Sequence, residues 1–530
     1  MVDPPRPHAA AVSRAGGWTL LQALLCAGTL IALWVALDPR TADLAAQVYR
    51  ANLFGREGFA LWDNGWFAGH HLPGYSLLFP PLAAAFGPRT VGVGSVLVSA
   101  LLFAHLVRLH WPGREVRLAV AWFALAAVGD LFIGRLTFAL GVTFALGCVV
   151  ALSHRRWPLA VALGVATAAA SPVTALLLVV VLPAGIRAVA PRWRPLVLGG
   201  PLVVPVATAV LFPEGGAQPY GAGGAALAII IALGVWAGLD PREKELRTGA
   251  LLYAVAVAGA FAVPSPMGSN VARLGVLVAG PVLLLGARSG RSRLLTAATC
   301  LLIVGWQLWA PVTELIKADT SPATTASYFQ PLLDRLKAEP HGRVEVVPTS
   351  TRWESVYVAP HVALARGWQT QLDARYNALF YRDELDAGEY EAWLRRLGIT
   401  HVAVSDAPKE RWGQLEERLL ADPPPYLREV WRSDHWRLFA LTDPQPLASG
   451  GRLTRLDGDS FTVATTHPGR VLVRIRWTPF WTPPPGACVE RSARGFTLLG
   501  VPGPGSWEVR ADWSVGAALG DPARACDEPS

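Results

Sequence analysis

Long apolar blocks separated by short polar connections fill the chain as far as residue 311, and no such block follows. Each block holds roughly 20 residues, the number that a helix needs to cross a hydrocarbon layer about 30 Å thick. The pattern therefore predicts a polytopic α-helical membrane protein with about 11 transmembrane helices. They are expected at 18–37, 90–107, 118–132, 136–152, 159–170, 173–186, 195–211, 225–239, 248–263, 274–285 and 294–309.

Beyond residue 311 the apolar positions form shorter helical and strand patterns. Helical patterns at 326–337, 390–397 and 409–420 alternate with strand patterns, which predicts a small α/β domain. The strand patterns lie at 344–347, 400–404, 428–431 and 436–441. From residue 453 onward, alternating runs at 461–465, 471–477 and 507–513 lie between Gly and Pro turns, as in a β-sandwich.

These patterns divide the chain into four parts. Residues 1–16 form an N-terminal tail, and 17–311 form a transmembrane domain with a large first outer loop at 38–89. An α/β domain at 312–444 and a β-sandwich at 445–530 complete the chain.

Basic residues gather in alternate connections between the predicted spans, as cytoplasmic loops require. The N-terminus is therefore expected in the cytoplasm, and the long loop and the C-terminal domains outside the plasma membrane. The net charge of +8 follows from this topology, so no nucleic-acid partner is expected. The basic residues in the connections expected in the cytoplasm are Arg108, Arg114, Arg117, Arg155, Arg156, Arg187, Arg192, Arg194, Arg242, Lys244, Arg247, Arg288, Arg291 and Arg293.

The five cysteines fall into two groups. Cys26, Cys148 and Cys300 lie in apolar spans and are interpreted as small hydrophobic side chains. Cys488 and Cys526 lie in the C-terminal part, where an oxidising environment would allow them to form a disulfide.

The first outer loop is much longer than a connection needs to be, and long loops of this kind are usually functional. We expect a helix from 42 to 54, with Thr41 as N-cap and Gly55 as its end. Asp43 and Gln47 would share one face of this helix, and Gln47 is a candidate substrate-binding residue. Asp43 is the candidate catalytic residue, a carboxylate presented to a polar cavity; the alternative is a carboxylate that only complements the helix dipole.

Two adjacent histidines, His70 and His71, follow several aromatic residues in the same loop. They are candidates for shaping a sugar pocket, although aromatic residues at a span boundary also form ordinary interfacial belts. Neighbouring histidines point in different directions, so no metal ligand is assigned and no cofactor is expected, while a divalent metal stays an open alternative. Tyr75, a further candidate substrate-binding residue, begins an apolar segment, 75–86, that resembles a re-entrant piece.

Four further polar residues are expected on the outer side beside predicted spans. Asp130 and Arg135 bracket the turn GDLFIG, where they either neutralise each other or serve a site. Arg273, near Asn270 in PSPMGSNVARLG, carries a planar guanidinium suited to a phosphate; the alternative is a snorkelling anchor. All four are candidate substrate-binding residues.

Motifs of soluble nucleotide-dependent enzymes are missing from the sequence. Asp457-Gly458-Asp459 matches a D-x-D pattern but lies between two short strand patterns, so it is interpreted as a hairpin turn. No phosphate-binding G-x-x-x-x-G-K-[ST] motif and no H-E-x-x-H motif occurs.

The first loop reads ADLAAQVYR and then WDNGWFAGHHLPGYSLLFPPL, which resembles YfhO-type and related bacterial members of the GT-C class of integral-membrane glycosyltransferases. The resemblance implies inverting transfer of a sugar from a polyprenyl-phosphate-linked donor, with an acid of the first outer loop as general base. Asp43 matches that position. Members often have paired acids here, whereas the neighbours of Asp43 are Ala42 and Leu44, so Asp130 becomes the candidate second acid.

The sequence hypothesis is thus a plasma-membrane glycosyltransferase that transfers sugar to a glycan or lipid acceptor of the cell envelope. In this hypothesis Arg135 and Arg273 hold the donor phosphate. Two other classes stay open: a multi-span transporter or lipid flippase, and a non-catalytic envelope scaffold.

Overall fold

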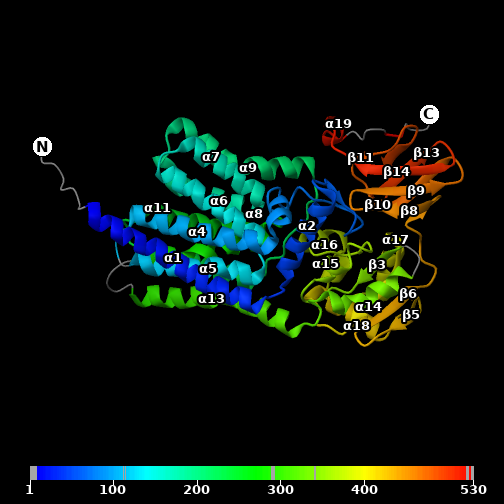
Figure 1. Ribbon diagram of the computed structural model, residues 1–530, viewed down its shortest axis with the longest axis horizontal. Helices are drawn as coiled ribbons and strands as arrows, with labels where there is room; N and C mark the ends of the chain where they lie inside the picture. The colour runs from blue at the N-terminus through cyan, green and yellow to red at the C-terminus, as the bar shows by residue number, and fades with distance from the viewer. Residues whose placement is uncertain are drawn as a thin grey trace. The chain divides into compact units, whose positions relative to one another are not determined.

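Figure 1 shows the computed structural model, which describes residues 9–111, 113, 115–287, 293–338, 342–520 and 525–526. The first half of the predicted N-terminal tail, residues 1–8, lies outside these ranges, as do Arg114, Arg288 and Arg291 of the charge pattern. The chain forms two compact units. The first contains Met1–Gln47, Tyr75–Ala207 and Ala217–Ile316, and the second contains Val48–Gly74, Thr208–Gly216 and Lys317–Ser530.

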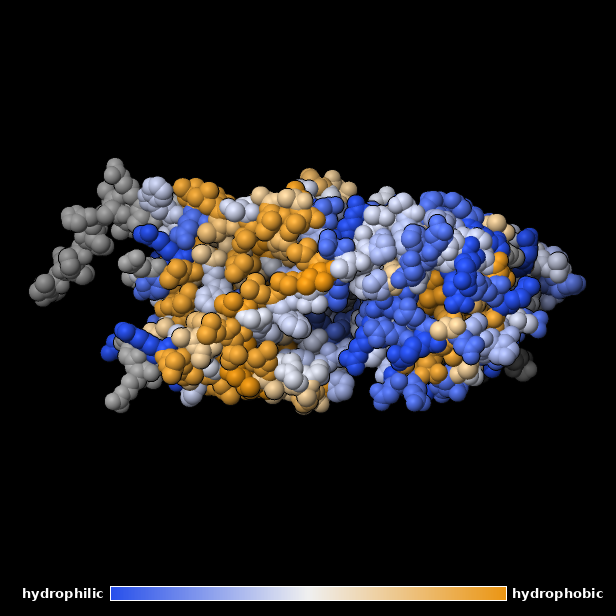
Figure 2. Space-filling model, turned by 90° about the horizontal axis from the view of Figure 1, so that it is seen from below, coloured by the Kyte–Doolittle hydropathy of each residue, from blue (hydrophilic) through white to orange (hydrophobic). Residues whose placement is uncertain are grey.

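The first unit is a bundle of apolar helices. Eight helices in the described ranges are long and apolar enough to cross a membrane, and three shorter apolar helices occupy the other predicted positions. The long ones include α1 (Ala9–Leu37), α4 (Pro88–His110), α5 (Glu115–Ile133), α6 (Leu136–Ser153), α9 (Arg194–Leu211), α11 (Lys244–Ala262), α12 (Ala272–Gly286) and α13 (Arg293–Thr320). The shorter ones are α7 (Trp157–Ala170), α8 (Pro172–Gly185) and α10 (Ala222–Gly238). The predicted polytopic fold is confirmed, and on the face in Figure 2 apolar side chains cover much of this bundle.

The helix of the first outer loop, α2 (Ala42–Glu57), runs further than predicted. Gly55 does not end it; Gly58 does, with a positive φ of 72° and its N–H donating to the Phe54 carbonyl. A left-handed residue after the last turn is the usual stop, and glycine adopts it without strain. Since Gly55 is tolerated inside the helix, the sequence pattern placed the end one turn early.

The segment after Tyr75 contains the short helix α3 (Phe79–Phe86). Its two prolines lie in the first turn, where the missing N–H groups cost nothing. The N–H groups of Leu77 and Leu78 both donate to the Ala169 carbonyl, so the backbone of this segment is bonded to the end of α7.

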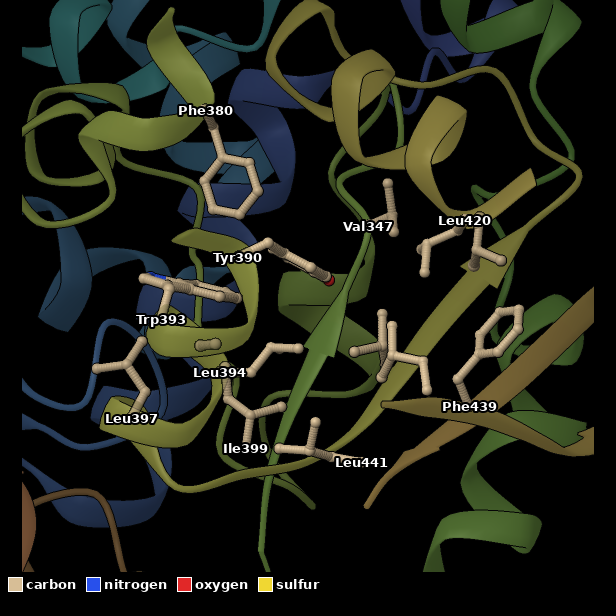
Figure 3. Close-up of a cluster of buried hydrophobic side chains, with 14 of the residues drawn as sticks. Val347, Phe380, Tyr390, Trp393, Leu394, Leu397, Ile399, Leu420, Phe439 and Leu441 are labelled. Carbon is tan, nitrogen blue, oxygen red and sulfur yellow. The ribbon is translucent and has the colours of Figure 1, made fainter. Parts of the chain in front are cut away.

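The second unit contains the predicted α/β layer. Its sheet has the order β3–β4–β6–β5, in which β3 and β4 are parallel and the other pairs antiparallel. The strands are β3 (Arg343–Val346), β4 (Ile399–Ser405), β5 (Leu427–Arg432) and β6 (Trp436–Leu441), and the helices are α14 (Ala326–Lys337), α15 (Glu354–Tyr357), α16 (Thr370–Tyr376), α17 (Ala387–Leu397) and α18 (Gln414–Ala421). Tyr390, Trp393 and Leu394 of α17 belong to its buried core, shown in Figure 3.

The remaining strands form the predicted β-sandwich of two four-stranded antiparallel sheets. One sheet has β7 (Ala448–Ser449), β10 (Gly469–Arg476), β12 (Cys488–Arg491) and β13 (Phe496–Val501). The other has β8 (Arg452–Leu456), β9 (Ser460–Thr465), β11 (Trp481–Thr482) and β14 (Gly505–Ala511). Asp457-Gly458-Asp459 joins β8 to β9 as a hairpin, and a disulfide joins Cys488 to Cys526, both as predicted.

The first outer loop is divided between the two units. Its beginning and end, with Asp43, Gln47 and Tyr75, belong to the first unit, whereas Val48–Gly74 belongs to the second. In the second part, β1 (Trp62–Asp63) pairs with β2 (His70–His71). From the sequence, the whole loop at 38–89 is predicted as part of the transmembrane domain.

Candidate active site

The start of α2 lies against the turn between α5 and α6. The Thr41 hydroxyl donates to the Ile133 carbonyl at 2.9 Å, so it holds this contact in addition to preceding the helix. Gly134 has a φ of 91°, and a Cβ there would stand 2.3 Å from the Leu44 nitrogen. Only glycine fits this close approach, which sets Asp43 beside Arg135.

Arg135 is shared by two carboxylates. Its Nε lies 3.4 Å from Asp43 Oδ2, and its Nη1 lies 3.9 Å from Asp130 Oδ1. Both contacts are long for charge-assisted hydrogen bonds, which are usually below about 2.9 Å. The side chains of Asp43 and Arg135 are 25% and 23% exposed, so both can be reached by a small molecule.

Arg273 brings a second guanidinium to the same cluster from the first turn of α12. It interacts electrostatically with Asp43, Asp130 and Arg135. Its guanidinium carbon lies 5.4 Å from the centroid of the Phe138 ring, and its buried Nε has no hydrogen-bond partner among the described residues. A buried donor left in this way is costly, which indicates that a ligand could complete it.

Gln47 lies one turn after Asp43 on α2. Its amide nitrogen donates to the Tyr75 hydroxyl at 2.7 Å, and its buried Oε1 has no partner in the described part of the chain. Tyr75 also interacts electrostatically with Arg273. Six predicted site residues are therefore brought together in the first unit: Asp43, Gln47, Tyr75, Asp130, Arg135 and Arg273.

Asn270 has a more local contact. Its amide nitrogen donates to the Pro266 carbonyl at 3.3 Å, which holds the turn that precedes α12. Asn270 therefore positions the segment that leads to Arg273.

The two histidines belong to the second unit and are packed inside it. His70 is fully buried and stacks on Trp66, with ring centroids 5.6 Å apart, and burial lowers its pKa. His71 Nδ1 lies 2.7 Å from Glu214 Oε1, and its Nε2 lies 3.0 Å from the Thr478 hydroxyl. Both rings thus make structural contacts within the second unit.

A cavity of about 680 Å³ lies inside the first unit, and its walls are mostly apolar. Phe138, which stacks under Arg273, and Leu274, which follows Arg273 in the chain, both line it. His110, Arg155 and Glu245 also line it. The sequence could not reveal this cavity because its walls come from several helices far apart in the chain.

The described ranges contain no group of three or more His, Cys, Asp or Glu side chains arranged to hold a metal ion. Asp43 and Asp130 are instead both matched with guanidinium groups.

The fold and the cluster define a multi-pass membrane protein with a charged site at one end of its helical bundle. No protein-family model and no curated protein matches the chain. Among solved structures it is similar to the archaeal oligosaccharyltransferase AglB from Archaeoglobus fulgidus, in complex with an inhibitory peptide and a dolichol-phosphate. The match has 12% identity and a TM-score of 0.32 and covers 73% of this chain and 69% of that one. A similarity at this level carries no argument about function, which must come from the residues themselves.

Proposed function

We propose that this protein is a glycosyltransferase of the GT-C class, which moves a sugar from a polyprenyl-phosphate donor to a hydroxyl of a cell-envelope acceptor. The observation that carries the proposal is the cluster of Asp43, Asp130, Arg135 and Arg273 directly beside an apolar cavity. This combination matches a substrate with a charged phosphate at the end of a hydrocarbon chain.

Asp43 acts as the general base. A base must come within about 3 Å of the acceptor hydroxyl, and Asp43 is accessible enough to do so. The Nε of Arg135, 3.4 Å from Asp43 Oδ2, orients the carboxylate. The acceptor proton passes to Asp43 while the acceptor oxygen bonds to the anomeric carbon from the face opposite the phosphate.

The two guanidinium groups hold the phosphate that leaves. As the bond between sugar and phosphate breaks, the electron pair stays on the lipid phosphate, and Arg273 and Arg135 balance its charge. A guanidinium presents a fork of donors that matches phosphate oxygens, and the buried Nε of Arg273 has no partner in the described ranges, so it can donate to a ligand.

The apolar cavity takes the first part of the polyprenyl chain. Its volume of about 680 Å³ lies within the usual range for ligand cavities. Phe138 and Leu274 connect its wall to Arg273, so a chain in the cavity would hold its phosphate at the cluster.

The charge pattern supports the outer face as the site of the reaction. Arg155, Arg156 and Arg247 lie in connections expected in the cytoplasm. The start of α2, the turn between α5 and α6, and the start of α12 belong to the alternate set of connections, expected outside.

The decisive variant is Asp43→Asn. We expect sugar transfer from a synthetic polyprenyl-phosphate sugar to fall by about 10²–10⁴-fold, the usual contribution of a general base, with an unchanged unfolding temperature. Asp38→Asn is the matched control, because Asp38 pairs with Arg40 and Arg89 outside the cluster. A rate of sugar transfer by Asp43→Asn equal to that of the wild type would show that Asp43 is not the general base.

A lipid flippase is the second candidate, because the cavity is lined both by Phe138 near the cluster and by Arg155 and Glu245. Translocation of a labelled lipid phosphate in vesicles without any acceptor would favour it. If the protein is a transferase, translocation will be absent there and transfer will require the acceptor.

A further inference from the structure

Exposed apolar side chains in the second unit are concentrated in one place. Among the described residues from Lys317 onward, the exposed large apolar side chains are Trp513, Val515 and Leu519, with Leu519 81% exposed. They surround the short helix α19 (Val515–Ala518), which follows the last strand of the sandwich. Phe59, from the loop segment in the same unit, is also exposed. We call Phe59, Trp513, Val515 and Leu519 the apolar tip.

A small buried cluster lies beneath the apolar tip. It consists of Leu61, Phe212, Phe480 and Ala517. Trp513 stacks on Phe480 with ring centroids 5.7 Å apart and lies 6.3 Å from Phe212. Leu61 lies two residues after Phe59, and Ala517 is part of α19 itself. The tip is therefore held by packed aromatic contacts.

Chain connectivity relates this cluster to the membrane. The candidate span that contains α9 ends at Leu211, and Phe212 is the next residue. A residue directly after a span lies at the membrane boundary. Phe212 and Trp513 are in ring contact within the second unit, so Trp513 packs against the residue that follows this candidate span.

We propose that the apolar tip inserts into the headgroup region of the bilayer and anchors the β-sandwich on the lipid surface. Tryptophan prefers this region because its ring is apolar and its N–H is polar. Exposed Val515 and Leu519 supply apolar surface that water would otherwise cover. Exposed Asp512 limits the insertion to the headgroups, since a carboxylate does not enter hydrocarbon. This proposal depends on the membrane fold and not on sugar transfer.

The test uses the full-length protein in lipid nanodiscs, with Cys26, Cys148 and Cys300 replaced by alanine and a nitroxide attached to Leu519→Cys. Collisions of the nitroxide with oxygen, which enriches in lipid, are compared with collisions with a water-soluble nickel chelate. The control label is His467→Cys, in the exposed turn between β9 and β10. Because Gly505 pairs with Thr465 and Arg510 with Ser460, this turn lies at the opposite end of β14, about 20 Å from Trp513.

We expect the label at 519 to collide often with oxygen and rarely with the nickel chelate. The label at 467 should collide often with the nickel chelate and less often with oxygen. Equal nickel collisions at both positions would show that the tip lies in water and would overturn the proposal. Protection from both reagents, with dipolar broadening between labels, would show a contact with a second copy and would overturn it as well. Unfolding temperatures equal to that of the unlabelled protein show that neither substitution disturbs the fold.

Discussion

Two clusters of charged side chains, one in each unit, are held in different ways. In the second unit Arg366 is almost fully buried and makes hydrogen bonds to Asp373 at 2.7 Å and 3.1 Å, with Glu416 at 3.4 Å. Asn377 and Tyr381 donate to the same carboxylate of Asp373.

The cluster of the first unit has charges of the same kinds but looser contacts. Arg135 meets Asp43 and Asp130 at 3.4 Å and 3.9 Å, and the buried Nε of Arg273 has no partner among the described residues. A buried charge surrounded by its own protein partners has little left to offer a ligand, and removing one of those partners leaves the charge uncompensated. The loose cluster keeps donors and an accessible carboxylate for a substrate.

The pKa of Asp373 illustrates the tight arrangement. Burial raises the pKa of this carboxyl, but the guanidinium of Arg366 and the hydrogen bonds from Arg366 and Asn377 hold it below its usual value. Asp373 therefore stays ionised inside the protein, where its charge is paired with Arg366.

The largest expected effect on stability is in the second unit. Asp373→Ala leaves Arg366 buried without its main partner, which typically costs about 3–5 kcal/mol. The unfolding temperature of the full-length protein, followed by tryptophan fluorescence, should fall clearly. Glu391→Ala is the control, because the Glu391–Arg395 pair is about one-third exposed and such pairs contribute below about 1 kcal/mol. Equal unfolding temperatures for Asp373→Ala and Glu391→Ala would contradict the expectation that the buried Arg366–Asp373 pair matters more for stability than an exposed pair.

The next effect is expected on donor binding in the first unit. Arg273→Lys keeps the charge but loses the planar fork, so KM for the lipid donor should rise by roughly 10–100-fold, equivalent to about 1.5–3 kcal/mol. The unfolding temperature should not change, since the Nε of Arg273 has no partner to lose within the described part of the chain. Arg40→Lys, outside the cluster, should leave KM as it is. A lower unfolding temperature with unchanged KM would make Arg273 a structural residue.

The smallest effect concerns Glu57, an exception to the tight pairing in the second unit. Burial, followed by the neighbouring charges of Asp63 and Asp459, raises its pKa to about 7. The folded state thus holds the Glu57 proton more strongly than the unfolded state. The contribution of Glu57 to the free energy of unfolding is therefore most favourable below about pH 4.5 and falls as pH rises through about 7. Glu57→Gln should remove this loss and raise stability at pH 8 by less than about 1 kcal/mol, after allowance for partial exposure.

Denaturant midpoints at pH 4, 6 and 8 measure the effect. The variant and the wild type should agree at pH 4 and separate at pH 8. Glu508→Gln, an exposed carboxyl, should show no such separation. Parallel pH curves for Glu57→Gln and the wild type would contradict the assignment.

The sequence predicted the elements of the fold better than their grouping. Apolar period and length located the helical positions, because each depends on residues close together in the chain. The α2 end at Gly58 was missed because Gly55 carries the same local signal. The passage of Val48–Gly74 into the second unit depends on contacts such as the His71–Glu214 pair, which joins residues far apart in the chain.

The same limit applies to the candidate site. Asp130 and Arg135 could be found because ionisable residues beside apolar spans are conspicuous. Two features of the site depend on the packing of separate helices. Gly134 allows Asp43 to approach Arg135, and Phe138 links Arg273 to a cavity. His70 carried the same sequence signal as a ligand-binding residue but is enclosed by aromatic rings.

The division of the chain has a consequence for its synthesis. The polypeptide passes between the two units at residues 47/48, 74/75, 207/208, 216/217 and 316/317. In a growing chain, Val48–Gly74 therefore lacks most of its packing partners until the ribosome has made the residues after 317. A secreted fragment that begins at Lys317 would lack Trp62, which packs in the core of the sandwich, and should misfold unless the missing loop is supplied as a separate peptide.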